Sequence, residues 1–213
     1  MTPVEASAEA RKICDLAPVI PVLVIEDAGS AADLARALVA GGLPALEVTL
    51  RTPAALEAIR EMAQVEGGVV GAGTLLTPGD VHRAVEAGAL FGVSPGATDR
   101  LLDAAEEAGL PMLPGAATAT EVMRLLERGY SVQKFFPAEA SGGAKALAAI
   151  GAPIPQVSFC PTGGVSLGNA PDYLSLRNVL CVGGSWVAPK DAVSADDWER
   201  IEALAREASG LAR

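Results

Sequence analysis

The sequence has 213 residues, half of them hydrophobic and only 4% aromatic, and its 26 Asp and Glu outnumber its 16 Lys and Arg to give a net charge of −10. This length fits a single α/β domain over residues 1–213, and the acidic balance leaves no basic stripe for nucleic acid. Because no run reaches the roughly 18 uncharged apolar residues that cross a bilayer, and the polar start MTPVEASAEARKI is unlike a secretory signal, we expect a cytoplasmic protein with no membrane partner.

A βα unit repeats along the chain. The segment SAEARKICDLA predicts a helix ahead of the first strand, and later helical patterns end in glycine, as at Gly88 and Gly109, before a short β-type run. Strands are predicted near residues 19–25, 45–50, 69–74, 90–95, 111–116, 131–137, 156–161 and 179–183.

The number of predicted strands decides between two α/β architectures. Open doubly wound sheets also alternate strands and helices, but they more often contain five or six strands. Eight units favour a single closed (β/α)8 TIM barrel, with an extra N-terminal helix. The segment SADDWERIEALAREASGLAR predicts the closing helix, because Ser194 and Asp197 have the spacing of a capping box.

The cysteines and the single histidine give no pattern of a metal site. Cys14, Cys160 and Cys181 include no C-x-x-C, so we interpret them as reduced core thiols. His82 lies in the helical pattern PGDVHRAVEAG beside polar residues and is expected to be solvated. We therefore expect neither a bound metal nor a cofactor.

The strand over 45–50 carries polar side chains where a hydrophobic layer would normally lie. Alternation in ALEVTLR directs Ala45, Glu47 and Thr49 to one side, and Arg51 continues that side at the strand end. The intervening apolar residues fit against helices, which leaves Glu47 inside the barrel. Barrel enzymes place their chemistry at the carboxyl ends of the strands, where these groups lie.

The segment SVQKFFPAEASGG (131–143) places an ammonium group among hydrophobic residues. By the same alternation, Val132, Lys134 and Phe136 point inward. An ion pair with Glu47 that only fills the barrel is one interpretation, but buried ion pairs are commonly no more stabilising than packed apolar residues. Function explains the lysine better, because removal from water favours the neutral amine, which attacks carbonyl groups.

Glycine pairs follow the last two predicted strands. FCPTGGVS contains Gly163 and Gly164, and CVGGSW contains Gly183, Gly184 and Ser185. Loops after the seventh and eighth strands of barrels frequently bind phosphate through backbone N–H groups. The matched positions therefore predict a phosphate site.

Two other strand ends add polar or turn residues. GAGT supplies the hydroxyl of Thr74, and VSPG supplies Ser94 and Pro95, which we expect to shape the rim. Arg51 can hold a substrate carboxylate through two hydrogen bonds, although a rim ion pair is the simpler alternative.

Taken together, these motifs resemble the family of short, imine-forming (class I) barrel aldolases that act on 2-keto-3-deoxy-6-phosphogluconate (KDPG) or 4-hydroxy-2-oxoglutarate. The similarity runs in the same order along nearly the whole chain. It rests on EVTLR (47–51), GAGT (71–74), SPG (94–96), KFFPAE (134–139), FCPTGG (159–164) and GGSW (183–186).

The resemblance implies cleavage of KDPG to pyruvate and glyceraldehyde 3-phosphate, without metal, in a homotrimer. It also implies Lys134 as the imine-forming lysine and Glu47 as the acid and base. Its remaining site residues are, for the pyruvyl part, Arg51, Thr74, Pro95, Phe136 and Thr162, and for the phosphate, Gly163, Gly164, Gly184 and Ser185.

Several alternatives stay open at this point. Relatives cleave 4-hydroxy-2-oxoglutarate or the galactonate epimer, although the intact TLR at 49–51 favours the gluconate substrate. The loop VIEDAGSA departs from the basic or neutral residues of many relatives, which leaves its contribution to sugar recognition open. A phosphosugar isomerase or epimerase would use Glu47 for proton transfer, with Lys134 as a charge stabiliser, and a catalytically silent barrel would only bind a phosphorylated metabolite.

Overall fold

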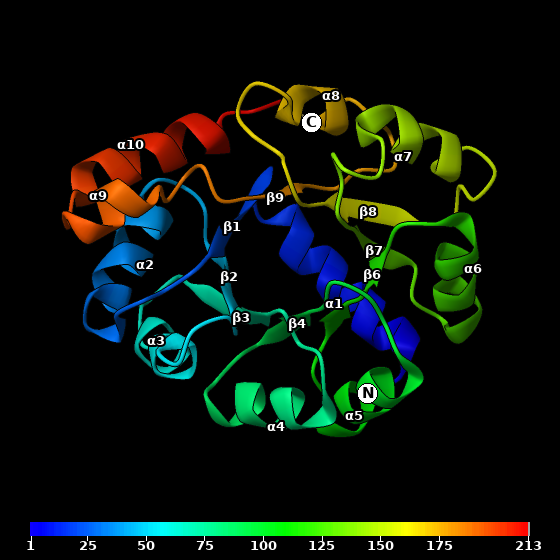
Figure 1. Ribbon diagram of the computed structural model, residues 1–213, viewed down its shortest axis with the longest axis horizontal. Coiled ribbons are helices and arrows are strands. Elements are labelled where there is room, and N and C mark those ends of the chain that lie inside the picture. The colour runs from blue at the N-terminus through cyan, green and yellow to red at the C-terminus, as the bar shows by residue number, and fades with distance from the viewer. Residues whose placement is uncertain (213) are drawn as a thin grey trace.

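The computed structural model describes residues 1–212, with short parallel strands at the centre and helices around them (Figure 1). The strands are β1 (Val19–Leu23), β2 (Ala45–Thr49), β3 (Val69–Gly73), β4 (Phe91–Val93), β5 (Met112–Leu113), β6 (Gly115–Ala116), β7 (Val132–Phe135), β8 (Ser158–Pro161) and β9 (Val182–Gly184). The helices are α1 (Pro3–Asp15), the 3-10 turn η1 (Ala28–Ser30), α2 (Ala31–Ala40), α3 (Ala55–Met62), α4 (Pro78–Glu86), α5 (Asp99–Ala108), α6 (Ala119–Arg128), α7 (Gly143–Gly151), α8 (Ala170–Leu174), α9 (Lys190–Ser194) and α10 (Trp198–Ser209).

The strands form a curled parallel sheet in two parts. The first part has the order β5-β4-β3-β2-β1-β9 and the second the order β6-β7-β8. The break falls inside the strand predicted over 111–116, at Pro114, which has no N–H to donate to a neighbouring strand. The predicted parallel α/β fold with an extra N-terminal helix is confirmed. The continuous eight-stranded ladder that we expected is not formed over residues 1–212.

Local sequence signals account for several helix boundaries. Capping boxes begin α1, α4 and α6, where the side chains of Thr2, Thr77 and Thr118 accept a backbone N–H from the first turn. Gly109 and Gly129 end α5 and α6 with φ of 69° and 112°, a conformation that favours glycine.

The C-terminal helical segment differs from the prediction in one respect. Ser194 is the last residue of the short helix α9, so it does not cap the closing helix. α10 begins at Trp198, and the Asp197 side chain accepts the N–H of Arg200. A turn at Asp196, with φ of +52°, separates the two helices.

Side chains of the curled sheet divide into an outer and an inner core. Leu46 and Val48 of β2 belong to the outer core between sheet and helices, as the alternation predicted. The inner core is closed by α1, which lies across the sheet (Figure 1) and packs against it with Ala10 and Cys14. The strand residues of the inner core lie mostly toward the amino ends of the strands, as Ala45 does. The carboxyl ends therefore remain for the site.

Two further sequence-based expectations concern the surface. His82 is exposed on α4. Among residues 1–212, every helix falls short of the length and apolar character needed to cross a bilayer.

Candidate active site

Lys134 and Glu47 meet inside the curled sheet. β7 carries Lys134 and β2 carries Glu47, and the two side chains are 6% and 3% exposed. Lys134 Nζ lies 3.2 Å from Glu47 Oε1 and 5.3 Å from the centroid of the Phe136 ring, within the range of a cation–π contact. The sequence prediction that one interior holds both groups agrees with this geometry.

Glycines of β3 make room for the Glu47 carboxylate. A methyl group on Gly73 would lie 2.3 Å from Glu47 Oε1, and one on Gly71 would lie 2.4 Å from the Phe91 ring. Both distances are far below van der Waals contact, so any larger residue would displace its neighbour. Only Thr74 of GAGT was predicted from the sequence to belong to the site, and this role of the two glycines was not.

A cavity of about 500 Å³ opens beside the pair, near the carboxyl ends of β7, β8 and β9. Phe136 lies between the cavity and the Lys134–Glu47 pair, because it lines the cavity and its ring also faces Lys134 Nζ. Lys134 and Glu47 are themselves buried next to this cavity rather than on its wall. Its lining includes Arg51, Phe136, Glu139, Thr162, Gly163, Gly164, Gly184 and Ser185.

The remaining predicted substrate residues are only partly brought together. Arg51 lines the cavity, and its Nε donates to Thr74 Oγ1 over 3.3 Å. Thr74 has φ of +61°, a strained conformation for a β-branched residue. Thr162 also lines the cavity and is 6% exposed. Pro95, predicted as a substrate residue, does not line the cavity. Its carbonyl lies close to Gly115 of β6.

The glycine pairs lie side by side, as predicted for a phosphate site. A bridge joins Thr162 to Gly183, which brings the ends of β8 and β9 together. Gly163 and Gly164 have φ of 102° and 81°, values that strain any residue with a Cβ. A methyl group on Gly184 would lie 1.7 Å from the Trp186 ring, so the backbone there must stay bare.

Three residues at this end of the molecule were not identified from the sequence. Glu139 lines the cavity, Tyr173 donates its hydroxyl proton to Glu139 Oε1, and Asn169 Nδ2 donates to the carbonyl of Gly164 over 3.1 Å. Glu139 is the last residue of the KFFPAE motif, but no local pattern links it to Asn169 or Tyr173, which lie more than 25 positions further along the chain. Tertiary contact alone makes the connection.

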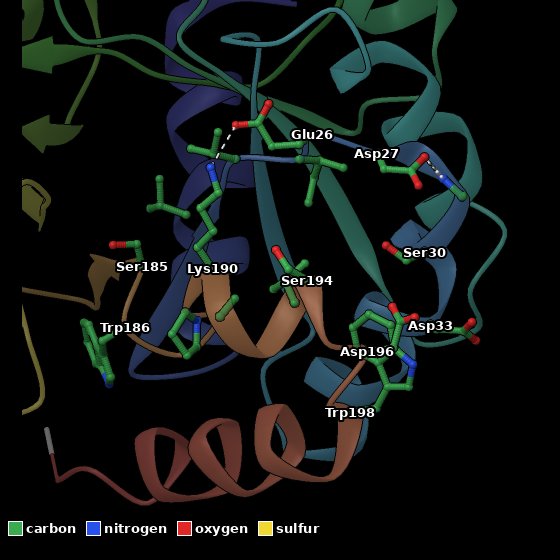
Figure 2. A pocket seen from close by; sticks show the side chains of 17 residues that line it. Glu26, Asp27, Ser30, Asp33, Ser185, Trp186, Lys190, Ser194, Asp196 and Trp198 are labelled. Carbon is green, nitrogen blue, oxygen red and sulfur yellow. Dashed lines mark hydrogen bonds and ion pairs between the residues drawn. The ribbon is translucent and has the colours of Figure 1, made fainter.

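A second cavity of about 840 Å³ adjoins the first and shares Val22, Val24 and Ser185 with it. Figure 2 shows acidic side chains of the loop after β1, including Glu26 and Asp27, around this space. Lys190 Nζ lies 3.6 Å from Glu26 Oε1, and both side chains are largely exposed. The unusual loop VIEDAGSA therefore borders a space next to the candidate active site.

The three cysteines lie in the inner core. Cys14, Cys160 and Cys181 are free and buried, as predicted. Cys160 is the register partner of Lys134 on the neighbouring strand. In the part of the chain that the structure describes, no group of three or more His, Cys, Asp or Glu side chains is placed to hold a metal ion.

A buried amine beside a carboxylate, next to a glycine-lined cavity at the carboxyl ends of parallel strands, is typical of the active site of an α/β enzyme. Comparison with known proteins gives the family. Residues 10–204 match the family model described as KDPG and KHG aldolase, and the chain belongs to this family of aldolases.

Individual relatives agree with this assignment. The 2-dehydro-3-deoxy-phosphogluconate aldolase of Pseudoalteromonas atlantica is 53% identical over 192 residues, which cover 90% of this chain and 89% of the relative. The 2-keto-3-deoxy-6-phosphogluconate aldolase of Zymomonas mobilis, solved with 3-phosphoglycerate, matches with a TM-score of 0.93 and 50% identity over 97% of this chain and 98% of that one. The KDPG aldolase of Legionella pneumophila, with pyruvate captured as a covalent carbinolamine, has a TM-score of 0.91 and 46% identity, covering 94% and 98% of the two chains.

Proposed function

We propose that this protein cleaves 2-keto-3-deoxy-6-phosphogluconate to pyruvate and glyceraldehyde 3-phosphate through an imine on Lys134. The observation that carries the proposal is the distance of 3.2 Å between Lys134 Nζ and Glu47 Oε1, with both groups buried. A lysine with this surrounding has a partner that can take its proton, and the neutral amine is the form that attacks a ketone.

Imine formation uses both members of the pair. Proton transfer from Lys134 to Glu47 leaves a neutral amine, which attacks C2 of the substrate to give a carbinolamine. Glu47 then returns its proton as the C2 hydroxyl leaves as water, and a cationic imine forms. The covalent carbinolamine of the Legionella relative supports this sequence of steps.

Bond cleavage uses the imine as an electron acceptor. The Glu47 carboxylate removes the proton from the C4 hydroxyl, C4 becomes the aldehyde carbon, and the electron pair of the C3–C4 bond moves to the imine to give an enamine. After glyceraldehyde 3-phosphate leaves, Glu47 gives its proton to C3. Hydrolysis of the resulting imine releases pyruvate and restores Lys134.

The cavity residues bind the two ends of the substrate. Arg51 holds the substrate carboxylate with paired hydrogen bonds, assisted by the Thr74 hydroxyl, and Thr162 and Phe136 shape the pyruvyl part. The phosphate binds to backbone N–H groups of Gly163, Gly164 and Gly184 and to Ser185. The 3-phosphoglycerate bound to the Zymomonas relative supports a site for a phosphorylated acid.

A second substrate, 4-hydroxy-2-oxoglutarate, is favoured by the matching family model, which covers aldolases for both compounds. It undergoes the same imine chemistry, because it also has a ketone at C2 and a hydroxyl at C4. Comparison of its cleavage rate with those of the phosphorylated gluconate and galactonate epimers measures the substrate preference.

We also infer the assembly and setting of the enzyme. Resemblance to the family supports a cytoplasmic homotrimer in the Entner–Doudoroff pathway, and size-exclusion chromatography with light scattering tests the trimer. We further infer that the two parts of the sheet belong to one eight-stranded barrel over a single domain. Bridges from Phe159 to Val179 and from Thr162 to Gly183 support this closure.

Borohydride trapping tests the imine. With pyruvate and borohydride, the wild-type chain is expected to gain the mass of one reduced pyruvate, and peptide mapping should place it on Lys134. Lys134→Ala should form no adduct and cleave no KDPG. Lys145→Ala, which changes an exposed lysine of α7, should behave as wild type.

The mapping on the wild-type chain keeps the test decisive if Lys134→Ala is unstable. An adduct on another lysine, or none at saturating pyruvate in folded protein, would contradict the imine. An isomerase or a silent binding protein would then be the better interpretation.

A further inference from the structure

The peptide groups of the glycine segment 162–165 are held by hydrogen bonds on one side. The carbonyl of Thr162 accepts the N–H of Ala138 over 2.8 Å, and the carbonyl of Gly163 accepts the N–H of Glu139 over 3.0 Å. Both donors belong to the loop after β7, which follows Lys134 in the chain. The loop that follows the candidate imine lysine therefore also fixes the candidate phosphate site.

Asn169 fixes the third carbonyl of the segment. Its Nδ2 donates to the carbonyl of Gly164 over 3.1 Å, while its Oδ1 accepts the backbone N–H of Ser166 over 2.7 Å. One amide side chain thus links the two ends of a short turn directly before α8. It is the only side chain that holds a carbonyl of this glycine segment within residues 1–212.

The pinned carbonyls determine where the N–H groups point. In a trans peptide, the C=O and the following N–H point in opposite directions, and the one cis bond of residues 1–212 lies elsewhere, at Phe136–Pro137. The N–H groups of Gly163, Gly164 and Val165 therefore point away from Ala138, Glu139 and Asn169. Gly163, Gly164 and Val165 all line the cavity, and their N–H groups donate no hydrogen bond within the described chain.

Tyr173 of α8 supports the same segment through Glu139. A methyl group on Gly164 would lie 2.7 Å from Glu139 Cβ and Cγ, so the stem of this side chain lies directly against the glycine. Tyr173 is 1% exposed and donates its hydroxyl proton to Glu139 Oε1. Burial and the Glu139 carboxylate raise the pKa of Tyr173, so the hydroxyl remains a donor at neutral pH.

We propose that Asn169 and Tyr173 are positioning residues that orient the N–H groups of the segment 162–165 toward the phosphate of the substrate. The inference rests on the proposed function for its ligand, but it concerns residues that do not touch the reacting atoms. Loss of either side chain should loosen the glycine segment and weaken phosphate binding. The Lys134–Glu47 pair should be unaffected.

The test compares Asn169→Ala and Tyr173→Phe with the wild-type chain. KM for KDPG is expected to rise about three- to tenfold, the loss corresponding to one hydrogen bond, while kcat stays unchanged. The dissociation constant of inorganic phosphate, measured by titration calorimetry, should rise by the same factor. The rate of borohydride-trapped pyruvate adduct formation should not change, because pyruvate carries no phosphate.

Matched controls separate positioning from general stability. Tyr130→Phe removes the hydroxyl of the other buried tyrosine. This hydroxyl donates to Glu106 Oε1 in a hydrogen bond of 3.1 Å, which does not involve the glycine segment. Ser175→Ala removes a hydroxyl just after α8 that donates to the carbonyl of Asp172. Both controls should keep the wild-type KM and phosphate affinity.

Two results would overturn the inference. One is unchanged phosphate affinity in both variants. The other is an equal loss of phosphate affinity and of pyruvate adduct formation, which would indicate a general structural role. A wild-type chain that forms no pyruvate adduct would refute the proposed function instead, and the calorimetric comparison would still decide the roles of Asn169 and Tyr173.

Discussion

At the scale of single residues, the Lys134–Glu47 pair trades stability for reactivity. Two charged groups lose their hydration when they are buried, and their attraction commonly no more than offsets that loss. Removal of only one member should be worse than removal of both, because it leaves an uncompensated charge in the sheet interior. We therefore interpret the pair as a functional feature that contributes little to the stability of the fold.

A double-mutant cycle makes this quantitative. Lys134→Met should lower the free energy of unfolding by about 3–5 kcal/mol, since Glu47 loses its partner. Lys134→Met combined with Glu47→Gln should recover most of that loss. Denaturant unfolding followed by circular dichroism measures all four corners of the cycle. A double variant less stable than either single variant would show that the pair is mainly structural.

At the scale of elements, β3 shows why a strand can be rich in glycine without being a turn. Gly71 and Gly73 leave space inside the curled sheet that the Phe91 ring and the Glu47 side chain occupy. β3 therefore has no side chains on its inner face at Gly71 and Gly73, where the neighbouring strands β4 and β2 place Phe91 and Glu47. Its pairing with β2 over five residues is kept all the same.

Gly73→Ala should move the Glu47 carboxylate without removing it. Because the added methyl would lie 2.3 Å from Oε1 and 2.7 Å from Cγ, the carboxylate must shift, and a displacement of about 1 Å lowers kcat by roughly 100-fold. Steady-state kinetics with KDPG measures the change. Gly79→Ala on α4, where a methyl meets nothing closer than 3.7 Å, is the matched control. Wild-type kcat in Gly73→Ala would contradict the assigned role of Glu47.

At the scale of the whole molecule, α1 closes the end of the sheet opposite the candidate site. Cys14 from α1 meets Cys160 and Cys181 in the inner core, although the three are far apart in sequence. Interaction with Cys160, together with burial, raises the pKa of the Cys14 thiol. All three thiols are buried, so reagents in solution should not reach them until the inner core opens.

Thiol labelling therefore reports the stability of the whole structure. A water-soluble disulfide reagent should label none of these three cysteines in the native protein. In denaturant, the free energy of exposure of all three should equal the free energy of global unfolding. Ser175→Cys, at an exposed position, is the control and should react at once. Fast labelling of Cys14 alone would mean that α1 detaches independently.

The sequence by itself determined the chain order of the main elements and the two reactive groups at the centre of the site. Period-two alternation placed Glu47 and Lys134 on inner faces, and the paired glycines marked the ends of β8 and β9, because these signals act between neighbours in the chain. The same local signals misplaced the start of the closing helix at Ser194. They also could not reveal that Pro114 divides a strand.

The tertiary structure alone decided which distant groups share a surface. The separation of Lys134 and Glu47, the room that Gly73 leaves for the carboxylate, and the contacts of Asn169 and Tyr173 with the glycine segment all depend on how the sheet curls. Sheet curvature sums small twists over every strand, and no short stretch of sequence encodes that sum. For this reason the reactive residues can be recognised from local sequence, but their relative positions are set only by the complete fold.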